Sequence, residues 1–270
     1  MIDLHCHLLD ETGCGPQDFA ESLEMCRRAV ADGVRTIVAT PRWDAPADEP
    51  PLSLADCEHK LKHLRQEMQG TLSLKLGFLI RFRVDLASLL KRYGAAITVG
   101  GGRYVLVSLP SLRTPEETEE VWDAVKRMGF AVIIARPECS PMLRRGSERL
   151  GRWVAGGVKL QLDAASIIGA HGREVRQFAM QCVRAYQDCV VVASSARDGR
   201  THRASLALAR EALVKKFGAR CARQLLSETP EAIIRSHTEM PNNGQNGLRN
   251  SALLSRLRAL RPQKTALNES

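Results

Sequence analysis

The chain has 270 residues, of which 44% are hydrophobic, and a formal net charge of +9. This size is enough for one large core, while no apolar run approaches the roughly 20 residues that a membrane-spanning helix needs. The N-terminus also lacks the features of a signal peptide, so we expect a cytoplasmic protein without membrane insertion.

Short apolar segments alternate along the chain with amphipathic ones. Their β-branched, nearly continuous apolar character is typical of strands that are buried on both faces of a parallel sheet. The predicted strands are Ile2–Leu4, Thr36–Ala39, Leu72–Ile80, Tyr104–Leu109, Ala131–Ala135, Val158–Leu162 and Val190–Ala193. The predicted helices are Phe19–Ala31, Leu54–Met68, Leu86–Tyr93, Pro115–Met128, Arg173–Gln187 and Ala204–Phe217. About seven strand–helix units favour a closed β/α barrel over an open sheet.

The composition changes near the C-terminus. Residues 1–237 are predicted to form one barrel domain. Residues 238–270 begin with a stretch rich in asparagine and glycine and continue with a short basic amphipathic segment, Leu253–Leu260. We expect this part to be a flexible basic tail.

The first seven residues contain a His-x-His motif at the end of an apolar strand. Residues i and i+2 of a strand point to the same side, so His5 and His7 are predicted to direct both imidazoles at one point. Such a pair is suited to a shared metal ion. Two histidines that are satisfied by hydrogen bonds and ligate nothing are the alternative. Cys6 is expected to point the other way, into the core.

Several segments together carry a family resemblance. They are Met1–His7, Glu21–Met25, Ile37–Pro41, Ile80–Arg81, Tyr104–Val107, Ile133–Glu138, Ser166–Gly169, Val192–Ser194 and Thr229–Ala232. The chain resembles the PHP (polymerase and histidinol phosphatase) superfamily, and within it the bacterial manganese-dependent protein-tyrosine phosphatases that accompany capsule and exopolysaccharide tyrosine kinases. The resemblance implies a distorted (β/α)7 barrel of the PHP type, with its site at the carboxyl ends of the strands.

The resemblance also implies a set of histidines and carboxylates that hold divalent metals, and His5 and His7 match two of them. The other expected ligand positions carry Cys14, Arg42, Leu79, Ser108, Arg136, Ser195 and Arg197. A guanidinium stays protonated and cannot ligate a metal. We therefore expect no catalytic residues, a vestigial metal site at His5 and His7, and no resident cofactor, with manganese possible if that residual site is occupied.

The resemblance implies that Arg42, Arg136 and Arg197 stand where the family has histidines, which leaves the expected pocket positively charged. The predicted anion-binding residues are Arg42, Arg81, Arg136, Arg197 and Arg203. Arginine pairs bidentately with phosphate, so the predicted ligand is a phosphotyrosine on a phosphorylated protein, such as a bacterial tyrosine kinase, or a phosphorylated sugar. Pairing of the arginines with nearby acids such as Glu138 or Asp198 is the alternative. Cys139, flanked by arginines, is expected to have a lowered pKa but lacks a phosphate-binding loop.

These observations lead to three functional hypotheses. The first is a degenerate, catalytically inactive tyrosine phosphatase that binds phosphotyrosine or another anion and regulates exopolysaccharide production. The second is a weakly active metal-dependent phosphotyrosine phosphatase with one metal on His5 and His7. The third is polyanion binding through the basic surface and tail. The aromatic content of 4% is low for a surface that stacks single strands, so a nucleic-acid partner is not expected.

Overall fold

The computed structural model describes residues 1–44, 50, 52–110, 116–198 and 205–237. The strands of these residues form two parallel sheets, of order β1-β2-β4 and β3-β5-β6-β7-β8-β9. The strand bounds are β1 Ile2–Cys6, β2 Thr36–Ala39, β3 Arg42–Trp43, β4 Ser73–Leu76, β5 Leu79–Arg81, β6 Tyr104–Ser108, β7 Ala131–Ala135, β8 Lys159–Asp163 and β9 Val190–Ala193. The predicted α/β class with parallel strands is confirmed.

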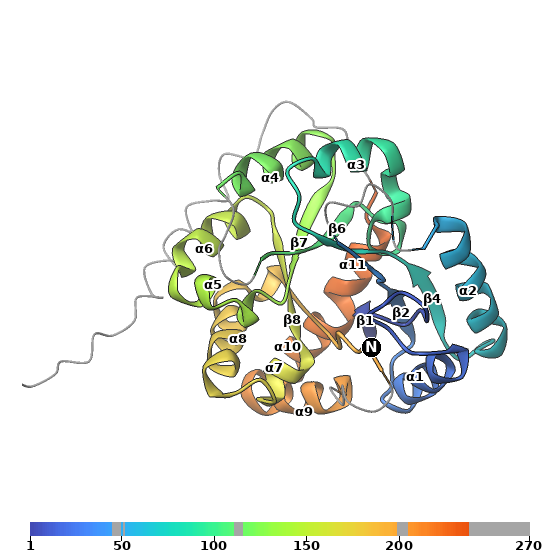
Figure 1. Ribbon diagram of the computed structural model, residues 1–270. Coiled ribbons are helices and arrows are strands. Elements are labelled where there is room, and N and C mark those ends of the chain that lie inside the picture. The colour runs from blue at the N-terminus through green and yellow to red at the C-terminus, as the bar shows by residue number, and fades with distance from the viewer. Residues whose placement is uncertain (45–49, 51, 111–115, 199–204, 238–270) are drawn as a thin grey trace, which may run out of the picture.

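Most helices form an outer ring around the strands, whereas α11 crosses the middle of the view (Figure 1). The longer ones are α1 Phe19–Ala31, α2 Leu54–Glu67, α3 Leu86–Tyr93, α4 Thr118–Arg127, α6 Ser147–Ala155, α8 Arg173–Tyr186 and α9 Leu206–Phe217. The shorter ones are α5 Pro141–Arg145, α7 Ala164–Ile168, α10 Ala219–Arg223 and α11 Thr229–Arg235. Polar side chains start several of them: Asp18 accepts from the backbone N–H of Glu21 before α1, and Ser53 accepts from that of Asp56 before α2. No helix in the described ranges is long and apolar enough to cross a membrane.

The core has two layers, as in a barrel. An inner cluster joins residues from strands of both sheets to Ile233 of α11, and its strand members include Leu4, Val38, Leu79, Leu106, Ile133 and Val191. A larger outer cluster lies between the sheets and the ring of helices, and it contains Cys6, Cys26 and Cys182. Burial of both faces explains why the strands read as nearly continuous apolar runs.

The first strand meets the residues that follow the last strand at a seam beside the candidate site. The contact is an isolated bridge between Cys6 and Ala196 rather than a continuous ladder. At this seam the backbone N–H of Ser195 donates to the carbonyl of His5, and that of His7 donates to the carbonyl of Ala196, each at 2.8 Å. The seam therefore positions His5 and His7 beside the residues that follow β9.

Some predicted bounds are wrong. The single strand expected over Leu72–Ile80 is two strands in different sheets, separated at Gly77 and Phe78. Gly77 passes close to another backbone, since a Cβ there would lie 3.0 Å from the carbonyl oxygen of Thr98. Helix α9 begins at Leu206 because the Ser205 side chain accepts from the first N–H groups of the helix. The predicted tail at 238–270 lies outside the described residues.

Candidate anion-binding site

A cavity of about 250 Å³ collects four of the five arginines that the sequence predicts for anion binding. Arg42 lies just beyond β2, Arg81 ends β5, Arg136 follows β7 and Arg197 follows β9. The carboxyl ends of parallel strands lie at one end of a barrel, so these residues meet although they are distant in sequence. Arg203 lies outside the described residues.

Two of these arginines already have acidic partners. Arg42 Nε lies 2.8 Å from Asp44 Oδ1, in a pair that is largely exposed to solvent and therefore contributes little stability. Arg136 Nε lies 2.9 Å from Oδ2 of the buried Asp163, although its N–H is not aligned for a hydrogen bond. The partner of Arg136 is thus neither Glu138 nor Asp198, the acids that the sequence suggested.

The other two arginines are available to a ligand. Neither Arg81 nor Arg197 has an acidic partner among the described residues, and the Nε atom of Arg197 is buried without a hydrogen-bond partner. An unsatisfied buried N–H group next to a cavity favours an acceptor there. The cavity also has apolar walls, to which Leu79, Ile134 and Leu143 contribute.

Glu138 has a structural position beside the cavity. Its side chain is fully buried, and Oε1 accepts from the backbone N–H of Asp163 at 2.8 Å and from Ser166 Oγ at 2.7 Å. Burial raises the pKa of Glu138 to about 7, and Oε2 has no hydrogen-bond partner. The carboxyl therefore links the segment after β7 to the end of β8 rather than balancing a guanidinium.

His5 and His7 lie side by side, with their Nε2 atoms 3.2 Å apart. Gln161 Oε1 lies 2.8 Å from His5 Nδ1, while Gln161 Nε2 donates to the carbonyl of Leu162. The amide oxygen must then accept, so His5 Nδ1 carries the proton and His5 Nε2 accepts from His7 Nε2–H. His7 Nδ1 in turn accepts from the Cys14 thiol at 3.6 Å. Each ring nitrogen of the pair has a partner without any metal.

Both imidazoles are neutral at physiological pH. Burial lowers the pKa of His5 to about 4. Burial also lowers the pKa of His7 well below its usual value, and the nearby positive charges of Arg197 and Arg42 lower it further. The positive charges of these arginines also disfavour a metal cation next to the histidine pair.

The residues present do not fit a cluster of manganese ions. Such ions prefer several oxygen ligands helped by imidazole. In the ranges of the chain that the structure describes, no group of three or more histidine, cysteine or acidic side chains is placed to hold a metal. The histidine pair is instead accompanied by Arg42, Arg136 and Arg197, which cannot ligate.

Cys139 differs from the sequence expectation. It lines the cavity, and its Sγ lies 3.5 Å from Arg136 Nη2. Its pKa is nevertheless raised, because burial and the charge of Glu138 outweigh the effect of Arg136. The expected lowered pKa is wrong, and the thiol is not activated as a nucleophile.

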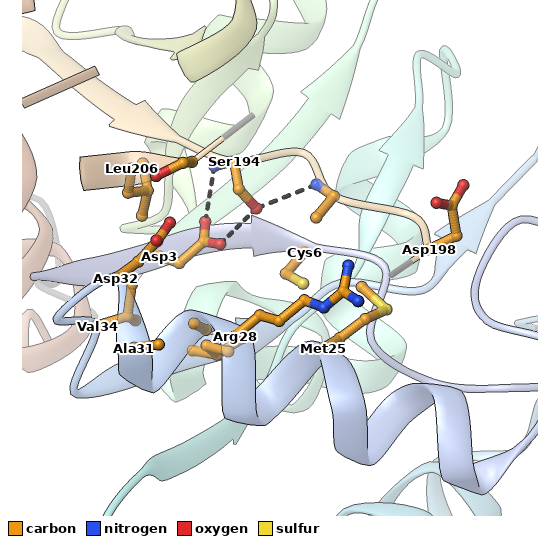
Figure 2. A pocket seen from close by; sticks show the side chains of 14 residues that line it. Asp3, Cys6, Met25, Arg28, Ala31, Asp32, Val34, Ser194, Asp198 and Leu206 are labelled. Atoms are coloured by element: carbon orange, nitrogen blue, oxygen red, sulfur yellow. Dashed lines mark hydrogen bonds between the residues drawn. The ribbon is translucent and has the colours of Figure 1, made fainter. Parts of the chain in front are cut away.

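A second cavity, of about 300 Å³, lies between α1 and the start of α9 and shows how the seam is held (Figure 2). There the side chain of Asp3 faces Ser194. Its carboxylate accepts from the backbone N–H of Ser194 at 3.0 Å and from Ser194 Oγ at 2.5 Å. Burial raises the pKa of Asp3 to about 6. These bonds join β1 to Ser194, the residue that follows β9.

Comparison with known proteins identifies the family of this chain. The family described as capsular polysaccharide synthesis, CpsB/CapC, matches residues 1–235. The chain belongs to this family. It is 28% identical over 240 residues to the tyrosine-protein phosphatase YwqE of Bacillus subtilis (strain 168), covering 88% of this chain and 93% of the relative. The tyrosine-protein phosphatase CpsB of Streptococcus pneumoniae is 23% identical over 241 residues, covering 87% and 98%.

A solved structure supports the same assignment. It comes from work on YwqE from Bacillus subtilis and CpsB from Streptococcus pneumoniae, described as unique metal-dependent tyrosine phosphatases. It superposes with a TM-score of 0.77 at 28% identity and covers 91% of this chain and all (100%) of the solved one. The family resemblance and the PHP-type fold predicted from the sequence are confirmed. The predicted inactivity gains no support, because these CpsB/CapC relatives are named as phosphatases.

Sequence reasoning missed Gln161, Asp163 and His171 as members of the site. A signal is present, because Lys159 and Gln161 alternate with apolar residues in the predicted strand Val158–Leu162 and Asp163 follows directly. Polar side chains at alternate positions near the carboxyl end of a barrel strand point to the site. His171 carried no comparable signal.

Proposed function

We propose that this protein acts on phosphotyrosine as a weak phosphatase whose binding of the phosphoryl group is stronger than its turnover. Arg81 and Arg197 bind the phosphate, and the apolar wall with Leu79, Ile134 and Leu143 contacts the phenyl ring. The observation that carries the proposal is a pair of guanidinium groups in one cavity at the carboxyl ends of the strands, neither of which has an acidic partner within the described ranges.

The weak turnover follows from the groups that the site contains. Fixed guanidinium groups stabilise the charge of a phosphoryl group in its transition state. The described residues, however, do not fit the metal cluster that would generate a hydroxide, and the histidine pair is neutral and hydrogen-bonded. The names of the relatives support the phosphatase alternative more directly than an inactive protein.

The proposed partner is a tyrosine-phosphorylated protein, such as a kinase of the capsule or exopolysaccharide system. The family description, which concerns capsular polysaccharide synthesis, supports this class of partner. A phosphorylated sugar offers the same phosphate but no aromatic ring for the apolar wall, so it should bind more weakly.

The test measures binding and turnover separately. Fluorescence anisotropy with a labelled phosphotyrosine peptide should show that Arg81→Ala and Arg197→Ala each weaken binding roughly tenfold or more, as expected for a lost charge-assisted hydrogen bond. Arg27→Ala, which removes an exposed arginine of α1, should leave the affinity unchanged. Equal affinity of all four proteins would contradict the proposal.

Turnover is followed with the same peptide, with manganese and with a chelator. We expect slow phosphate release in both conditions. Release at the rate of CpsB or YwqE measured side by side, abolished by chelator and by His5→Ala, would show that the missing ligands have been replaced. Complete absence of release, with tight binding, would support the inactive binding protein.

A further inference from the structure

We propose that His171 and Asp163 are positioning residues that form a proton-controlled latch on Arg136. The latch keeps the Arg136 guanidinium paired at neutral pH and releases it to the anion in the cavity as the pH falls. This inference rests on the anion site proposed above and adds a regulatory element to it.

The three side chains meet at a single nitrogen atom. His171 Nε2 lies 3.3 Å from Arg136 Nη2 and also 3.3 Å from Asp163 Oδ2. The arginine nitrogen can only donate, and the carboxylate oxygen can only accept. A ring nitrogen carries either a lone pair or a proton, so His171 Nε2 can serve one of these partners at a time.

The conformation of Arg136 is imposed by its surroundings. Its Nε atom lies 2.9 Å from Asp163 Oδ2, yet this N–H has no aligned acceptor. Its backbone is in the left-handed region, with φ 52° and ψ 47°. A non-glycine residue adopts this conformation only where the surroundings impose it, and such residues cluster at functional sites.

The proton state of His171 decides which partner it serves. As a neutral ring with a bare Nε2, His171 accepts from Arg136, and Asp163 balances the guanidinium. As an imidazolium, His171 donates to Asp163, neutralises the carboxylate and repels Arg136. The cavity then gains one positive charge and a guanidinium that is free to bind an anion. Because coupling is reciprocal, a bound anion must also favour protonation of His171.

Other titratable groups face this cluster and must be separated from it. Glu138 accepts from the backbone N–H of Asp163, and its pKa is raised to about 7 by burial, so it gains a proton in the same range. Cys139 Sγ contacts Arg136 Nη2, and its pKa is raised. Arg176, on the neighbouring helix α8, donates to the carbonyl of Ile167 and stays charged.

The experiment uses sulfate as the probe, because sulfate remains a dianion across the neutral range. Its affinity for the full chain is measured by calorimetry from about pH 8 to about pH 6, where histidine side chains change charge. One added charge within several ångströms of the anion should strengthen binding of the wild type roughly three- to tenfold over this range. His171→Gln should reduce the increase to the part that Glu138 contributes, and Asp163→Asn should bind more tightly at high pH with a smaller increase. Glu138→Gln should keep the part that depends on His171, and the double variant His171→Gln/Glu138→Gln should show no increase.

The outcomes separate this inference from the proposed function. Sulfate binding that is absent, or unaffected by Arg81→Ala and Arg197→Ala, would overturn the anion site itself. Binding at that site with the full pH dependence in His171→Gln, or with the dependence lost in Glu138→Gln, would overturn only the latch. If the variants do not fold, the wild type still decides, because sulfate should raise the NMR titration midpoint of His171, and an unchanged midpoint would refute the latch.

Discussion

Asp3 connects the two ends of the barrel, and its ionisation should make the stability of the protein depend on pH. The carboxyl is buried, and burial raises its pKa from 3.8 to about 6. A carboxyl with a raised pKa binds its proton more tightly in the folded chain than in the unfolded one. Its contribution to the free energy of unfolding is therefore largest in acid and is lost as the pH rises from about 4 to about 6.

The two pKa values determine the size of this effect. Linkage between pH 4 and pH 7 corresponds to a loss of about 2 kcal/mol in the free energy of unfolding. Asp3→Asn keeps the size and one acceptor of the side chain but cannot ionise, so this pH-dependent part should vanish in the variant. The bonds to Ser194 change as well, which shifts the stability of the variant by an amount that does not depend on pH.

Urea unfolding followed by circular dichroism measures both proteins at several pH values. The free energy of unfolding of the wild type minus that of Asp3→Asn should fall by about 2 kcal/mol from pH 4 to pH 7. Subtraction removes other titrating groups, such as Glu119, whose pKa is lowered to about 2 by Arg149. Asp123→Asn, an exposed site on α4, is the matched control and should follow the wild type. Parallel curves for wild type and Asp3→Asn would refute the reasoning.

Two further substitutions test the supports of the site. Gln161→Leu removes the nearer acceptor of the buried His5 Nδ1–H and leaves Ser195 Oγ, at 3.2 Å, as the other. It should lower the free energy of unfolding by roughly 0.5–1.5 kcal/mol, and unchanged urea unfolding would contradict the assigned hydrogen-bond order. Gly102→Ala places a Cβ against the carbonyl oxygen of Ile233, so it should displace α11 at a cost of roughly 1–3 kcal/mol. Gly102 has φ −77°, which alanine adopts without strain, so a loss in Gly102→Ala measures the clash, and unchanged urea unfolding would exclude it.

The sequence alone determined the class of fold and its family. The alternation of apolar strands and amphipathic helices identified Phe19–Ala31, Thr36–Ala39 and Ala131–Ala135 with the bounds that the structure shows. Periodicity and capping depend on neighbours within a few residues, which explains this success. The strand over Leu72–Ile80 failed because its apolar run continues across Gly77, where only the contact with Thr98 shows that the chain changes sheet.

The sequence also brought the arginines of the site together, because strand ends of a parallel barrel share one end. Only the tertiary structure decided which of these arginines are paired with an acidic side chain. Arg136 is balanced by Asp163, which is distant from it in sequence, whereas Arg81 and Arg197 have no acidic partner in the part of the chain that the structure describes. Likewise, His-x-His predicted two converging imidazoles, while Gln161 on β8 fixed which nitrogen of His5 carries the proton. Hydrogen bonds and ion pairs of this kind join atoms across the fold, and their direction depends on distances that a linear sequence does not contain.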